Sequence, residues 1–130
     1  MEEQEKQILN DLDKSLDFLA DGRYSTTFYV AGVQHRPDWQ DMLEELYEEQ
    51  VLQLEPEPTN KYDPNAVKIM APFETGLVRF LGYVPSKNGP APVIASLIGK
   101  GINLRATILE VNEDAKPWKA IGVLIEEVGH

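Results

Sequence analysis

The stretch between residues 57 and 67 is the feature of this sequence that most constrains its fold. It reads Glu-Pro-Thr-Asn-Lys-Tyr-Asp-Pro-Asn-Ala-Val and separates two apolar runs, at 51–54 and 66–70. Proline presets φ, whereas asparagine and aspartate bond their own backbone and tolerate left-handed conformations. The stretch therefore predicts a shaped loop between two strands. It also places an aromatic ring beside a carboxylate, at Tyr62 and Asp63.

Short apolar segments with alternating polarity predict six strands along the chain. They cover residues 24–33, 51–55, 66–70, 77–84, 102–111 and 118–128. Helices are expected at two of the connections, at 39–49 with Asp38 as the N-cap and at 90–98. Most connections are too short for the crossovers of a parallel sheet. The pattern predicts a mainly β protein with helices (α+β), built as a small, closed or partly closed barrel.

An amphipathic helix is expected before the first strand, over residues 4–20. Its apolar residues recur at helical spacing and are Ile8, Leu9, Leu12, Leu16 and Leu19. Asp21 and Gly22 provide a stop signal. We therefore expect an N-terminal extension at 1–23 and one domain at 24–130. The extra helix would pack on the barrel or on a partner chain, including a second copy in a homodimer.

Several classes of protein are disfavoured by the composition of the 130 residues. The chain has no cysteine and only two, widely separated histidines, which argues against disulfides, thiol chemistry and a histidine-based metal site. No apolar run approaches the roughly 18 residues of a membrane span. The acidic N-terminus is unlike a signal peptide. These features predict a soluble cytoplasmic protein without a metal.

The charge of the chain is strongly acidic but unevenly distributed. The net charge is −10, and residues 38–57 hold eight acids and no base. Residues 58–130 hold eight bases and seven acids, so any basic groove would have to lie in the second half. The chain contains neither a Walker-type phosphate loop nor a G-x-S-x-G nucleophile motif. We therefore expect no enzyme activity and no cofactor.

Two motifs resemble those of the HIRAN domain family. The first is the run E-P-x-N-x-Y-D-x-N-A-V at 57–67, and the second is Gly82-Tyr83-Val84-Pro85, about fifteen residues later. The resemblance covers residues 26–128. It implies a variant of the OB barrel, here six-stranded, and a non-enzymatic module that binds single-stranded DNA and captures its free 3′ end. In this family, ATPase activity belongs to fused helicase-like translocases, which act in DNA repair at stalled replication forks.

The resemblance also assigns roles to residues. Tyr62 would stack on the terminal base, and Asp63 would accept a hydrogen bond from the 3′-hydroxyl. The Arg-Tyr pair of the family is replaced by Gln34 and His35, so the phosphate contact would move to Arg36. A lysine after the fourth strand of the family corresponds to Ser86 or Lys87. Further candidates for phosphate contacts are Lys61 and Arg79.

Two functions from different classes therefore remain open. The first is a module that binds single-stranded DNA weakly and in a salt-sensitive way, beside a helicase or translocase acting in trans. The second is a protein-interaction domain that uses its acidic helices and whose DNA pocket has decayed. In that case Asp63 would bond the amides of its own loop and Tyr62 would cover the end of the barrel.

Overall fold

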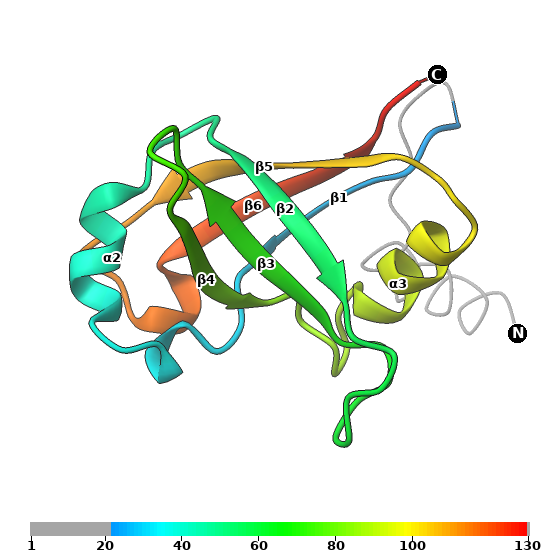
Figure 1. Cartoon of the computed structure of the whole chain (residues 1–130), viewed down its shortest axis with the longest axis horizontal. Helices are drawn as coiled ribbons and strands as arrows, with labels where there is room; N and C mark the ends of the chain where they lie inside the picture. Colours follow the sequence, from blue (N-terminus) through cyan, green and yellow to red (C-terminus); the bar gives the residue numbers. More distant parts are fainter. Residues whose placement is uncertain (1–21, 130) are drawn as a thin grey trace, which may run out of the picture.

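The computed structural model describes residues 22–129, which form one strongly curled antiparallel sheet with two helices (Figure 1). The strand order is β1-β6-β5-β2-β3-β4, so β6 lies between β1 and β5. The strands are β1 (Ser25–Tyr29), β2 (Val51–Pro56), β3 (Val67–Pro72), β4 (Val78–Tyr83), β5 (Leu104–Val111) and β6 (Ile121–Glu127). The expected mainly β fold is confirmed. The helix expected at 4–20 lies outside the described residues.

The two edges of the sheet meet at a single bridge. Ala31, just after β1, pairs with Tyr83 at the end of β4, and each backbone N–H donates to the other carbonyl at 2.8 Å. Gly82 permits this approach, because a Cβ there would lie 2.2 Å from the carbonyl oxygen of Ala31. Its φ of +150° is also unfavourable for other residues. The sheet is therefore a half-barrel closed at one point.

Helices α2 (Trp39–Glu45) and α3 (Ala91–Gly99) lie at opposite ends of the curled sheet (Figure 1). Each buries its apolar side in the common core, α2 through Met42 and Leu43 and α3 through Ala91 and Ile94. The strands contribute alternate residues to this core, as in the buried–intermediate pattern of β3. The connections expected to be helical thus close the ends of the half-barrel.

The predicted boundaries of the first helix are wrong. The expected helix at 39–49 ends at Glu45, because Leu46 is already extended, with ψ at 154°. Glu49 has a positive φ of 69°, and its N–H donates to the carbonyl of Ile108, so the chain returns to β5. Asp38 occupies the N-cap position with φ at 53°, but its side chain makes no capping hydrogen bond. Tertiary pairing with β5 has overridden the local helical pattern.

The expected first and last strands are also too long. The first ends at Tyr29, and after a turn at Gly32 (φ 80°) the chain forms a 3₁₀ helix, η1 (Val33–His35). The last begins at Ile121, because Trp118 lies in a second 3₁₀ helix, η2 (Pro117–Lys119). In both segments a β-rich composition continues into a tight turn, which alternation alone does not reveal.

Candidate nucleic-acid interface

A bulge in β4 brings two aromatic rings onto one face of the sheet. Lys68 is opposite Tyr83 and Met70 is opposite Phe80, so β4 has one residue more than β3 between these pairs. The extra residue reverses the alternation of side chains. Phe80 and Tyr83, three positions apart, therefore share the outer face with Lys68. Their rings meet edge to face, with centroids 5.4 Å apart.

Phe80 holds two cations on this face. The Cζ of Arg36 lies 4.0 Å from the ring centroid, and the Nζ of Lys68 lies 4.7 Å from it. Such contacts contribute about 0.5–1 kcal/mol each when exposed. Arg36 forms no ion pair with a carboxylate among residues 22–129. Its charge is therefore positioned by an aromatic ring and is not neutralised by an acid.

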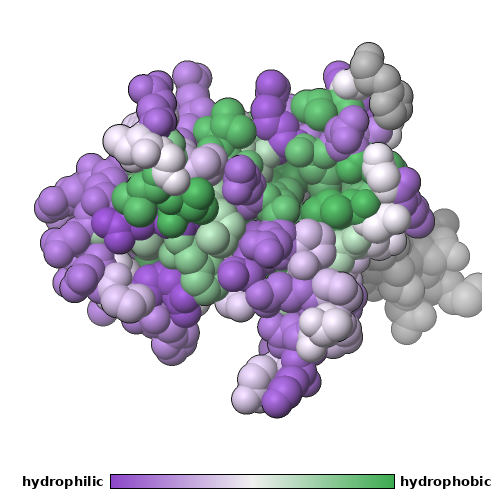
Figure 2. Space-filling view, in the orientation of Figure 1, coloured by the Kyte–Doolittle hydropathy of each residue, from purple (hydrophilic) through white to green (hydrophobic). Residues whose placement is uncertain are grey.

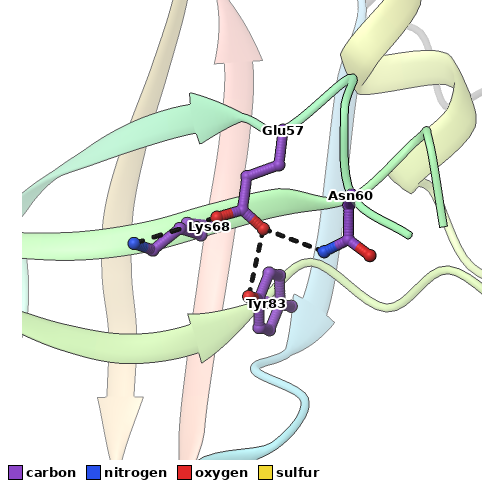
Figure 3. A network of polar contacts seen from close by, with 4 residues as sticks. All are labelled: Glu57, Asn60, Lys68 and Tyr83. Atoms are coloured by element: carbon purple, nitrogen blue, oxygen red, sulfur yellow. Dashed lines mark hydrogen bonds and ion pairs between the residues drawn. The ribbon is translucent and has the colours of Figure 1, made fainter. Parts of the chain in front are cut away.

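Glu57 is the centre of a polar network beside these rings (Figure 3). Its Oε1 accepts hydrogen bonds from the Tyr83 hydroxyl at 3.1 Å and from the Asn60 Nδ2 at 3.0 Å. The Nζ of Lys68 lies 3.9 Å from its Oε2. Burial, followed by the hydrogen bond and the charge of Glu57, raises the pKa of Tyr83. Tyr83 is therefore a stable proton donor to Glu57 at neutral pH.

Asn60 connects this network to the protruding loop at residues 57–66 (Figure 1). Its Oδ1 accepts hydrogen bonds from the backbone N–H groups of Tyr62 at 2.9 Å and of Asp63 at 3.1 Å. Asp63 in turn accepts a hydrogen bond through Oδ1 from the N–H of Asn65 at 2.9 Å. The two sides of the Asn60 amide thus fix the loop tip on Glu57. A loop ordered in this way loses less entropy when it binds a ligand.

The loop presents Tyr62 to solvent. Its side chain is 96% exposed, so it does not cover the end of the barrel. Asp63 is half-buried and bonds an amide of its own loop, as expected if its role were structural. An exposed ring with a fixed backbone can stack on a planar ligand.

The other residues singled out in the sequence lie in different places. Arg36 belongs to the same array as the loop, through Phe80, Tyr83, Glu57 and Asn60. Gln34 and His35 are exposed in η1, and no hydrogen bond or ring contact joins them to Tyr62 or Asp63 in the described part of the chain. Lys61 and Lys87 are exposed. Arg79 binds Glu45 of α2 through two hydrogen bonds of 2.8 Å and is engaged there.

Sequence reasoning missed Phe80 and the central position of Glu57. A signal for Phe80 exists, because Leu81 is the apolar residue expected in the core and its neighbour must face outward. The signal for Glu57 is its place in the motif, but its partners become evident only when β3, β4 and the loop are assembled.

A comparison with protein families supports the resemblance to the HIRAN domain family that the two sequence motifs indicate. The family model described as HIRAN domain matches residues 24–125, most of the chain. The chain belongs to the HIRAN family. HIRAN domains as a family are nucleic-acid-binding modules. A search of curated proteins found no significant match.

Two solved structures share the HIRAN fold with this chain. One is the crystal structure of a protein from Lactobacillus plantarum, with a TM-score of 0.65 and 20% identity, covering 84% of this chain and 100% of that one. The other is the HIRAN domain of human HLTF, with a TM-score of 0.59 and 14% identity, covering 79% of this chain and 74% of that one. At such identities the likeness establishes the fold alone.

Residues 22–129 contain no group of three or more histidine, aspartate or glutamate side chains arranged to hold a metal ion. None of the helices formed by these residues has the length and apolar character needed to cross a membrane.

Proposed function

We propose that this HIRAN protein is a non-enzymatic module that binds the 3′ end of single-stranded DNA. The observation that carries the proposal is the exposed ring of Tyr62 on a loop whose backbone is fixed by Asn60. Tyr62 would stack on the terminal base, an interaction of about 1–3 kcal/mol. Asp63 would accept a hydrogen bond from the 3′-hydroxyl and repel a terminal phosphate.

Cations around the loop would contact the phosphates. Arg36 is the strongest candidate, because Phe80 holds its guanidinium without a carboxylate partner in the described chain. Lys61 and Lys87 are exposed and available, whereas Arg79 would first have to leave Glu45. Gln34 and His35 directly precede Arg36 in the sequence and would contact the adjacent nucleotide. With few cations, the affinity would be low.

The proposed context is DNA repair in the cytoplasm. The sequence contains no phosphate-binding loop of a motor. We place the module beside a helicase or translocase that acts in trans. Its contribution would be to recognise an unmodified DNA end.

Fluorescence anisotropy with labelled single strands at low salt tests the proposal. Replacing Tyr62→Ala should weaken binding about 5- to 150-fold, the equivalent of one lost stacking interaction. Asp63→Asn should reduce the preference for a 3′-hydroxyl over a 3′-phosphate. Tyr47→Ala is a matched control, because Tyr47 is also exposed (59%) but follows α2. It should bind as the wild type does.

Two outcomes would reject the proposal. One is the absence of binding by the wild type at low salt, where contacts to phosphates are strongest. The other is an equal effect of Tyr62→Ala and Tyr47→Ala. Either result would favour an interaction domain that uses the acidic surface of α2, where Asp41 and Glu44 are exposed.

A further inference from the structure

Strands β2 and β5 pair over only two positions before they diverge. Val51 is opposite Thr107 and Leu52 is opposite Ala106. From Gln53 onward β2 pairs only with β3, and the beginning of β5 pairs only with β6. The wall of the half-barrel therefore opens between the end of β2 and the beginning of β5.

The opening is an apolar groove. It has a volume of about 460 Å³, and the second half of β2, the C-terminal end of α3 and the beginning of β5 form its sides. Its half-buried apolar residues are Leu54, Met70, Ile98, Ile102 and Leu104. Figure 2 shows this hydrophobic hollow between hydrophilic surfaces. The other lining residues include Gln53, Glu55 and Asn103 but no cation, so the groove is unsuited to phosphates.

The sequence contains a segment of matching character. Residues 1–21 precede the described chain, and five apolar residues between 8 and 19 recur at helical spacing. A helix over residues 4–20 would be about 25 Å long. Its apolar stripe would need a surface to cover it, because a single short helix is marginal in water. The groove offers five half-buried apolar side chains for that purpose.

The described chain begins close enough for this segment to reach the groove. The carbonyl of Tyr24 accepts a hydrogen bond of 2.8 Å from the N–H of Glu127, and Glu127 is opposite Leu104. Tyr24 is thus two strand spacings, about 10 Å, from Leu104 at the side of the groove. Residues 20–22 can span about 10 Å when extended. A helix ending near Leu19 would therefore reach the groove of its own chain.

We propose that residues 4–20 form a helix that docks in the groove between β2 and β5 of the same chain. Its leucines would cover Leu54, Ile98, Ile102 and Leu104, and its acidic residues would face solvent. The inference rests on other residues than the proposed DNA binding. The lining of the groove contains no residue of the 57–66 loop and neither Arg36 nor Phe80, although Met70 at its edge is paired with Phe80.

Engineered disulfides test the proposal cleanly, because the 130-residue sequence has no cysteine. Ile102→Cys would be combined in turn with Leu9→Cys, Leu12→Cys or Leu16→Cys, and oxidised at low protein concentration. At least one pair should form an intramolecular bond, visible as faster migration of the monomer under non-reducing conditions. The control combines the same three with Val78→Cys, exposed on β4. These control pairs should form the bond several-fold more slowly.

Two results would overturn the proposal. Disulfide-linked dimers without the intramolecular product would show that a second copy occupies the groove. Equal bond formation with Ile102→Cys and Val78→Cys would show that the segment has no fixed site.

A second variant does not depend on the geometry of a disulfide. Leu12→Asp together with Leu16→Asp should lower Tm by several degrees and shift the methyl NMR signals of Ile98 and Leu104. Asp13→Asn with Asp17→Asn changes the polar side of the segment and should leave those signals in place. Unchanged methyl signals in the leucine variant would contradict docking.

Discussion

At the scale of single residues, Glu57 is the group on which most contacts of the site depend. Glu57→Ala would leave the Tyr83 hydroxyl and the Asn60 Nδ2 without their acceptor. We expect a loss of about 1–2 kcal/mol in the free energy of unfolding, measured by urea denaturation. Glu57→Gln retains one acceptor oxygen, so its free energy of unfolding should fall less than that of Glu57→Ala.

The matched control for this prediction is Glu110→Ala. Glu110 also accepts a hydrogen bond from a tyrosine, Tyr29 at 2.9 Å, but on the exposed surface. Glu110→Ala should lower the free energy of unfolding clearly less than Glu57→Ala does, since exposed polar contacts contribute little to stability. Equal losses for Glu57→Ala and Glu110→Ala would contradict the central position of Glu57.

The raised pKa of Tyr83 leads to a prediction about pH. The causes are burial and then the hydrogen bond to Glu57. Since folding favours the protonated phenol, the stabilisation is complete below about pH 10, the ordinary pKa of tyrosine, and is lost as the pH rises through the higher folded value. Urea midpoints at pH 8 and at pH 11 should differ more in the wild type than in Tyr83→Phe. An equal difference would show that Tyr83 does not titrate with folding. Tyr29→Phe should be measured beside Tyr83→Phe. Tyr29 has the same kind of partner, since its hydrogen bond to Glu110 and the charge of Glu110 raise the pKa of Tyr29.

At the scale of elements, closure of the half-barrel depends on Gly82. In Gly82→Ala the new Cβ would approach the Ala31 oxygen to 2.2 Å and a methyl carbon of Val30 to 2.8 Å. The bridge between Ala31 and Tyr83 must then separate, and we expect a loss of about 3 kcal/mol or more in thermal or urea unfolding. Gly99→Ala, at the end of α3 with open space around it, should change stability by less than about 1 kcal/mol. A similar stability of both variants would refute the dependence of closure on Gly82.

The elements themselves could be predicted from the sequence because each has its own period. Alternating polarity predicts the strands, and the helical spacing of apolar residues at 39–49 and 90–98 predicts the two helices. The boundaries were not predictable where a distant strand decides them. Glu49 leaves the helical pattern to donate its N–H to Ile108, almost sixty residues away.

The candidate site could be predicted only in part, for a similar reason. The motif identified the loop and its exposed Tyr62, because both are local in the sequence. The array of Arg36, Phe80, Lys68 and Glu57 requires the bulge in β4, which reverses the side-chain alternation and leaves no mark in the pattern.

At the scale of the whole molecule, the acidic charge limits how strongly DNA can bind. The net charge is −10, and the candidates for phosphate contacts at the proposed site are four cations, Arg36, Lys61, Lys68 and Lys87. For single strands the slope of log K against log salt is about −0.7 per contacted phosphate. We therefore expect a slope no steeper than about −3, measured by anisotropy at several salt concentrations. A steeper slope would reveal a basic surface elsewhere.

The position of β6 has a consequence for the order in which the protein can be assembled during synthesis. This strand lies between β1 and β5, and its residues from Gly122 to Glu126 lie within the register of both. While the ribosome is still adding these residues, β1 has no neighbouring strand among the described residues, and only Ala31, just after β1, can pair with Tyr83. The backbone N–H and C=O groups of β1 therefore lack their partner strand until nearly the last described residue has been synthesised.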